Sequence, residues 1–287
     1  YVYLLNPQDA AITASFDDSP VGDNVGGPIH VELYVVEPGA ARSQDGSLVF
    51  NGVNSYATFA SGSYLGGATV SQFTIEFWLK AGRTDACQAL FGKTEFWKEW
   101  SIGMGTGGEV GFMHAWPNTY YGVTSPNGVI NAGQWQHVAI VGQGTTGSIY
   151  VDGVLVKQAD SLRGEISFAG VATGSAIAPM TFGFRDNTTL PDDCYYLGEL
   201  ADIRIWDIAL TAGEIGGLQT TDPATNAPGL RHWIPFNEGS GSTFSDIVGG
   251  LQGQVFNTTW SKPGPKTLRV PQEYATIQAA VNAAFEG

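Results

Sequence analysis

The sequence has few charged residues, and few of those are positive. Of its 287 residues 14% are charged, with 13 Lys and Arg against 27 Asp and Glu, which gives a formal net charge of −14. Such an acidic chain repels nucleic-acid phosphates and anionic lipid, so we expect no nucleic-acid partner. Its apolar runs are all shorter than the roughly 18 residues that a membrane-spanning helix needs, so no membrane span is expected.

Cysteine is almost absent. Cys87 and Cys194 are the only two, and neither lies in a C-x-x-C pair or near a spaced pair of histidines, which leaves a zinc site unsupported. Each follows a polar segment and precedes a strand-like run, so they are either two separate thiols or one disulfide. A bond between them would close a loop of about 107 residues, worth roughly 4–5 kcal/mol in the chain-entropy model.

Helical periodicity is scarce too, and alternation of apolar with polar residues takes its place. In 73–80, Phe73, Ile75 and Phe77 share one face of a strand, while Glu76 lies on the other. Residues 148–156 predict a hairpin whose turn is Asp152-Gly153. Further strand-like runs lie at 30–36, 46–60, 88–93, 109–114, 120–124, 135–142, 195–208 and 230–236, and one short helical stretch lies at 210–215. With 43% hydrophobic residues to form a core, the sequence predicts an all-β sandwich.

Two acidic, glycine-rich segments, one near residue 16 and one near residue 236, have similar sequences. Phe16-Asp17-Asp18 precedes a Gly-Gly pair, as Phe236-Asn237-Glu238 does, and each follows a short apolar run. We interpret these runs as the first and last strands, neighbours in one sheet. Coincidence in a chain with 39 glycines is the alternative.

Five motifs in a fixed order resemble a known family. Residues 45–57, 73–80, 134–139, 149–153 and 197–215 resemble successive motifs of laminin-G-like jellyroll domains, members of the concanavalin A-like lectin/glucanase superfamily. The resemblance runs from about residue 10 to residue 260. It implies a sandwich of two antiparallel jellyroll sheets, which we place at residues 1–262.

The last residues resemble something else. After a stiff Pro-Gly-Pro linker at 263–266, residues 267–287 are similar to the beginning of a right-handed parallel β-helix of the pectate-lyase kind. Ile277, Ala280, Val281 and Ala284 form an apolar helical stripe of the kind that caps a solenoid. We therefore expect this chain to be the front module of a larger polysaccharide-active or adhesive protein, whose downstream β-helix is a lyase or hydrolase. The absence of Met at the start is consistent with a removed signal peptide or an excised fragment.

The acids do not form the pair that a superfamily glucanase needs. Such an enzyme places two carboxyls about 5 Å apart on one sheet face. Glu199 and Asp202 are three residues apart, hence on opposite faces of a regular strand, and Arg204 stands where a further acid would help. Glu76 has no acid two residues away, and we expect His137 to be structural, bonded beside Trp135. We therefore expect this chain not to be an enzyme.

Aromatic residues are concentrated between 94 and 121. Sugars offer apolar ring faces, so carbohydrate sites present exposed aromatics beside polar acceptors. The candidates for carbohydrate binding are Trp97, Trp116, Asn118, Tyr120 and Tyr121. Tyr120 and Tyr121 cannot both point inward from one strand, and core packing is the alternative for each aromatic residue.

The resemblance also implies a structural Ca²⁺ ion. Calcium takes six to eight oxygen ligands from carboxylates and loop carbonyls. The candidate ligands are Asp17, Asp18, Asp23, Asn51, Asp202 and Asp246. Solvated turn acids are the alternative for each of them.

These observations favour a secreted or cell-surface, non-catalytic carbohydrate-binding module. The alternative is a structural or protein-interaction domain that docks onto its own downstream β-helix. The acidic net charge disfavours strongly anionic glycans unless calcium bridges them, so neutral sugars are the preferred ligand class.

Overall fold

The computed structural model describes residues 12–15, 30–33, 46–59, 69–93, 100–116, 119–167, 180–184 and 194–261. The chain divides into two compact units, residues 44–264 and residues 1–43 with 265–287. In the latter unit, β1 (Ile12–Ser15) pairs antiparallel with β2 (His30–Leu33). The expectation that the first strand pairs with the last one is therefore wrong for the described strands, because β1 takes β2 as its partner. The predicted linker and β-helix cap at 263–287 lie outside the described residues.

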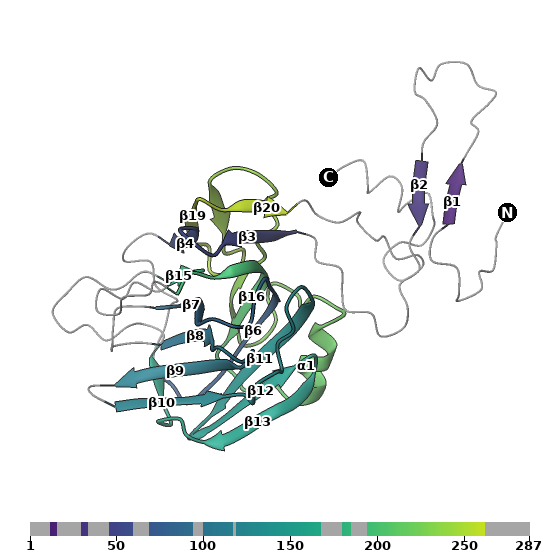
Figure 1. Cartoon of the computed structure of the whole chain (residues 1–287). Helices are drawn as coiled ribbons and strands as arrows, with labels where there is room; N and C mark the ends of the chain where they lie inside the picture. The colour runs from purple at the N-terminus through teal and green to yellow at the C-terminus, as the bar shows by residue number, and fades with distance from the viewer. Residues whose placement is uncertain are drawn as a thin grey trace. The chain divides into compact units, whose positions relative to one another are not determined.

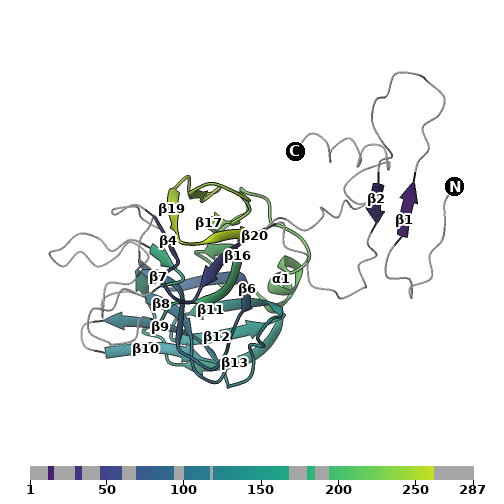
Figure 2. The ribbon, with the colours of Figure 1, turned by 45° about the horizontal axis from the view of Figure 1, so that its top comes forward.

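Residues 44–264 form two antiparallel sheets, as predicted (Figures 1 and 2). We call the sheet with strand order β10-β9-β8-β7-β15-β4-β19-β18 the first sheet. Its strands are β4 (Tyr56–Phe59), β7 (Gln88–Lys93), β8 (Trp100–Met104), β9 (Val110–Trp116), β10 (Thr119–Thr124), β15 (Met180–Phe182), β18 (Thr243–Ser245) and β19 (Gln252–Phe256).

The second sheet has the order β13-β12-β11-β6-β16-β3-β20, with β17 also paired to β16. Its strands are β3 (Ser47–Asn51), β6 (Gln72–Ala81), β11 (Trp135–Gln143), β12 (Thr146–Val151), β13 (Val154–Asp160), β16 (Leu197–Trp206), β17 (Leu230–Ile234) and β20 (Thr259–Ser261). A small separate pair joins β5 (Thr69–Val70) to β14 (Ile166–Ser167).

The core lies between the two sheets and follows from the alternation in the sequence. Phe73, Ile75, Phe77 and Leu79 of β6 point into it, as the period-two pattern predicts. From the first sheet, Phe91, Phe112 and Phe182 meet them, and Phe77 contacts Phe91 edge-on with ring centroids 4.9 Å apart. This aromatic core fixes the distance between the sheets.

The outer face of the second sheet is covered as well. Helix α1 (Ala212–Leu218) begins with a capping box in which Thr211 and Glu214 exchange hydrogen bonds. Its Ile215 packs against Ala139 and Trp206, on the side of the sheet that faces away from the core (Figure 1). Helix α1 and the segment around it cover the middle strands of this face, whereas most residues of the edge strand β13 are exposed.

Candidate functional site

The outer face of the first sheet carries a row of residues with small side chains or none. Ala89 of β7 lies opposite Gly103 of β8, Gly103 lies opposite Gly111 of β9, and Gly111 lies opposite Thr124 of β10. In the next row on the same face, Ser101 lies opposite Met113, and Met113 lies opposite Gly122. Small residues at aligned positions leave a hollow of about 230 Å³ above these strands.

The glycines are needed for this shape. A Cβ atom on Gly111 would lie 2.8 Å from Thr124 Oγ1, and one on Gly103 would lie 3.0 Å from the Gln88 carbonyl oxygen. A larger residue at either position would therefore fill the hollow and push its neighbour.

The rim combines apolar and polar groups. Met113 is 40% exposed, and Ser101 and Thr124 supply hydroxyls. Glu109 Oε2 accepts a hydrogen bond of 2.8 Å from the Gly107 amide. This bond holds the Glu109 carboxylate in place at the rim of the hollow. Among the described residues that line the hollow there is no Lys, Arg or His. The described part of the lining is thus neutral to weakly acidic.

The two cysteines line the same hollow. Cys87 is exposed just before β7, and the Ala89 amide donates a 2.8 Å hydrogen bond to the Cys194 carbonyl. The segment that holds Cys194 is therefore bound to the same strand that Cys87 precedes. The structure has no disulfide between Cys87 and Cys194, so their pairing stays a prediction.

Of the predicted sugar-binding residues, Tyr120 reaches this face. It lies opposite Ala115 on the outer side of β10 and is 45% exposed, whereas Tyr121 lies opposite the buried His114 on the inner side. The expectation that Tyr120 and Tyr121 do not both point inward is confirmed. Trp116 ends β9, but its side chain, like Trp97 and Asn118, lies outside the described residues.

Sequence reasoning missed an aromatic row farther along the first sheet. Tyr56 of β4 stacks on Phe256 of β19 with ring centroids 4.6 Å apart, and Phe184 stacks on Tyr195 at 4.7 Å. The rings of Tyr56 and Phe184, whose centroids are 6.0 Å apart, connect the two pairs. Four distant segments supply these rings, so no local motif reveals them. Because the stacked rings cover each other's faces, they offer a sugar little flat surface.

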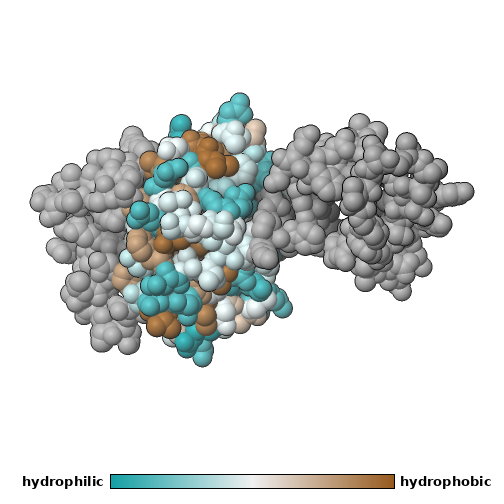
Figure 3. Space-filling view, turned by 90° about the horizontal axis from the view of Figure 1, so that it is seen from above, coloured by the Kyte–Doolittle hydropathy of each residue, from teal (hydrophilic) through white to brown (hydrophobic). Residues whose placement is uncertain are grey.

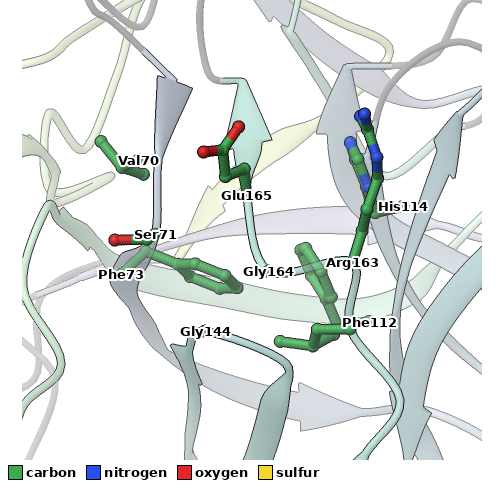
Figure 4. Close-up of a pocket in the computed structure, with 10 residues that line it drawn as sticks. Val70, Ser71, Phe73, Phe112, His114, Gly144, Arg163, Gly164 and Glu165 are labelled. Atoms are coloured by element: carbon green, nitrogen blue, oxygen red, sulfur yellow. The ribbon is translucent and has the colours of Figure 1, made fainter.

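A second, smaller hollow opens at one end of the sandwich (Figure 4). Phe73 and Phe112 line it, with Arg163 beside His114 and Glu165 across from them. Burial, reinforced by the charge of Arg163, lowers the pKa of His114 to about 4. The space of about 10 Å³ has room for about one water molecule and is too small for a sugar.

The predicted metal ligands that are described, Asn51, Asp202 and Asp246, already accept hydrogen bonds from other groups of the protein. Asn51 Oδ1 accepts hydrogen bonds from three amides of its own turn. Asp202 Oδ1 accepts one of 2.9 Å from Trp233 Nε1. Asp246 Oδ1 accepts from the amides of Trp233, Val248 and Gly249, while Oδ2 pairs with His232 Nδ1 at 2.5 Å. Within the described part of the chain, no three His, Cys, Asp or Glu residues are grouped to hold a metal ion. Asp17, Asp18 and Asp23 lie outside it.

The prediction that Glu199 and Asp202 occupy opposite faces is wrong. A bulge in β16 shifts its register on β6 between Ala201 and Arg204, and Asp202 adopts the left-handed backbone conformation with φ 47°. The extra residue brings both acids to the outer side, but they have different partners. Glu199 pairs with Lys80 at 3.2 Å, whereas Asp202 lies 3.3 Å from Arg204 Nη2.

Glu76 also has partners that the sequence did not predict. Its carboxylate accepts a 3.0 Å hydrogen bond from Arg204 Nη1 and lies 2.6 Å from His137 Nε2, all three side chains being buried. Burial alone raises the pKa of Glu76, but Arg204 and His137 together lower it below its ordinary value. The expectation that His137 is bonded beside Trp135 is not met, because it is bonded to Glu76 and packs on Trp78.

Solved structures and one family model are similar to this chain. The crystal structure of a protein from Bacteroides ovatus described as carbohydrate binding matches with a TM-score of 0.57 at 17% identity, over 86% of this chain and 67% of that chain. A heptameric SAP-like pentraxin from Limulus polyphemus matches with a TM-score of 0.47 at 20% identity, over 75% of this chain and 97% of that one. No curated protein matches the chain. In the described residues, no helix has the length and apolarity to cross a membrane. The family model of the concanavalin A-like lectin/glucanases superfamily matches residues 51–216, more than half of the chain, and the chain therefore belongs to that superfamily.

Proposed function

We propose that this chain is a non-catalytic carbohydrate-binding module whose site is the hollow on the outer face of the first sheet. The carrying observation is the aligned row Ala89, Gly103, Gly111 and Thr124, which opens about 230 Å³ on a rigid sheet. Its neighbours Ser101 and Glu109 supply polar atoms, and Met113 and Tyr120 supply apolar surface. A sugar presents the complementary combination of hydroxyls and apolar ring faces.

The charge of the lining favours a neutral glycan. Glu109 is the one carboxylate among the described lining residues, and no cation accompanies it. A carboxylated or sulfated sugar would be repelled there, while hydroxyl groups can donate hydrogen bonds to the carboxylate.

The absence of enzyme activity is part of the proposal. Retaining glycosidases need two carboxyls free to act as acid and nucleophile. Glu199 is held by Lys80 and by the Ser47 hydroxyl at 2.6 Å, and Asp202 is held by Trp233 and Arg204. Neither acid lines the hollow.

Membership of a superfamily that includes lectins supports this function, as does the description of the B. ovatus protein. We further propose, from the motifs alone, that the module is secreted or displayed at the cell surface ahead of a polysaccharide-active or adhesive β-helix.

A glycan array on the chain tests the proposal. We expect binding to neutral oligosaccharides or polysaccharides and little binding to sulfated or uronic-acid glycans. Binding to no glycan at all would refute the function, and binding restricted to anionic glycans would refute the ligand class. Incubating each bound glycan with the chain and analysing it by mass spectrometry should show no cleavage.

A second candidate function is docking onto the chain's own downstream β-helix. The turn that holds Val53, 69% exposed, is tied to the end of β19, where Asn257 Nδ2 donates to the Asn54 carbonyl at 3.2 Å. Phe256, 36% exposed, precedes Asn257. On the face shown in Figure 3, however, brown and teal side chains alternate, so the apolar surface visible there forms separate patches. Such a broken apolar surface disfavours an extensive dry interface on this face.

A further inference from the structure

Two residues that the proposed binding chemistry does not use stand at the edge of its site. Cys87 and Cys194 both line the hollow, although they lie far apart in the sequence. The hydrogen bond from the Ala89 amide to the Cys194 carbonyl, 2.8 Å long, holds the backbone of Cys194 against β7, two residues beyond Cys87. Cys87 is exposed and Cys194 half-buried, so an oxidant in solution can reach Cys87.

The chain has two cysteines, and both belong to the lining of the proposed binding site. We propose that Cys87 and Cys194 form a disulfide that closes one wall of the hollow and thereby raises its affinity for glycan. The effect on affinity rests on the proposed function, whereas the disulfide itself does not.

The chemistry is a thiol–disulfide exchange with a small disulfide such as oxidised glutathione. The Cys87 thiolate attacks the small disulfide, forms a mixed disulfide and releases one small thiol. The Cys194 thiolate then attacks Cys87 Sγ, closes the protein disulfide and releases the second small thiol. Two protein thiols are oxidised, and one small disulfide is reduced to two thiols.

The disulfide affects binding by restricting the motion of the two segments that hold Cys87 and Cys194 at the side of the hollow. The hydrogen bond from the Ala89 amide holds the main chain at Cys194 against β7, but a main-chain bond does not fix the rotamer of the side chain. A cross-link fixes the wall before the ligand arrives and lowers the entropy cost of binding. We expect the oxidised chain to bind glycan about threefold or more tightly than the reduced chain.

The pairing is tested first, without any glycan. The full chain is equilibrated with oxidised glutathione, denatured, alkylated and weighed by mass spectrometry. We expect no alkyl group without reductant and two after reduction, with a fall in melting temperature of roughly 10 °C on reduction. Two alkyl groups in the unreduced sample would overturn the proposal.

The effect on binding is then measured with a glycan that the array identifies. Its affinity for the oxidised and reduced chain is compared with that for the double variant C87S/C194S, which should bind like the reduced chain under both conditions. Equal affinity of the oxidised and reduced chain would overturn the role of the bond in the site. If no glycan binds either form, the proposed function fails, while the alkylation result still decides the pairing.

Discussion

At the scale of single residues, one buried ion pair joins the sheet to its covering segment. Arg204 reaches Glu76 of β6 through Nη1 and Asp222 after α1 through Nη2, and it lies over the Trp233 ring with its Cζ atom 4.6 Å from the ring centroid. A buried charge is tolerated only while its partners remain, so this site is sensitive to the loss of one member.

Replacing Arg204 by Met should therefore destabilise the fold. R204M leaves the buried Glu76 carboxylate without its cation, and we expect a loss of about 3–5 kcal/mol in the free energy of unfolding measured with urea. The double variant E76Q/R204M, which removes both charges, should lose less than R204M alone. A loss below about 1 kcal/mol for R204M would contradict a structural role for the pair.

The same pair predicts acid sensitivity. The pKa of Glu76 is lowered in the folded chain, so its contribution to stability is present above its ordinary pKa of 4.5 and is lost as the pH falls through the folded value. Urea unfolding between pH 6 and pH 3 should show a smaller acid-induced loss for E76Q/R204M than for the unmodified chain. Parallel losses for the two chains would count against this assignment.

The protonation of His114 should make the stability of the chain depend on pH at higher values than Glu76 does. Its folded pKa of about 4 lies below the ordinary value of 6.5, so between these values the unfolded chain binds more protons than the folded one. The unmodified chain should therefore lose stability from pH 6.5 down to about pH 4, relative to the variant H114Q. A constant difference in the free energy of unfolding between the two chains over this range would show that His114 does not titrate in this way.

At the scale of elements, two glycines should respond to the same substitution with opposite signs. Gly153 closes the β12–β13 hairpin with φ 76°, and a Cβ there would lie 2.5 Å from Gln219 Nε2. Gly216 lies inside α1, and a Cβ atom added there would have nothing within 4 Å. G153A should cost about 1–2 kcal/mol, and G216A should add about 0.5–1 kcal/mol. Guanidinium unfolding midpoints measure both, and a stabilising G153A would contradict the turn geometry.

The hairpin shows what local sequence was able to predict. Asp152 and Gly153 both have positive φ, which is the turn that an Asp-Gly pair between two strands favours. The strands with clear alternation, such as β6 and β11, and the short helix were predicted for the same reason, since their signals lie within one segment. Strand β8 was missed because it is short and its outward residues, Ser101 and Gly103, are of types common in turns, although they alternate with large core residues.

The site shows what local sequence was not able to predict. Gly103 and Gly111 carry no chemical signal of their own, and they form a floor only because the strand register aligns them. Likewise, the bulge at Asp202 is a property of the pairing between β16 and β6, so simple alternation assigned its face wrongly. Tyr120 was found because strand alternation alone forces one of two adjacent tyrosines outward.

At the scale of the whole molecule, calcium binding is a proposal that a melting experiment tests. Asp17, Asp18 and Asp23 remain its candidate ligands, because the side chains of Asn51, Asp202 and Asp246 are held by other groups of the protein. Calcium at 100 times its Kd would add about 2.7 kcal/mol. We expect a melting temperature several degrees higher in calcium than in EDTA. Identical melting curves in calcium and in EDTA would show that the chain binds no stabilising calcium ion.

The hollow on the outer face of the first sheet directs the search for a ligand to that face. If the hollow binds sugar, a side chain that fills it must abolish binding without unfolding the sandwich. Ser101 lines the hollow on β8, whereas Thr243 is an exposed residue of β18 at the opposite edge of the same sheet. S101F and T243F therefore form a matched pair.

The most direct test is the affinity of these two variants, measured by calorimetry, for the neutral glycan that the array identifies. We predict that S101F weakens binding at least about tenfold while T243F binds like the unmodified chain, since only the former excludes ligand from the site. Both variants must show an unchanged unfolding midpoint, or S101F is replaced by S101Y and measured again. Full affinity in a folded S101F would contradict the claim that this hollow is the binding site.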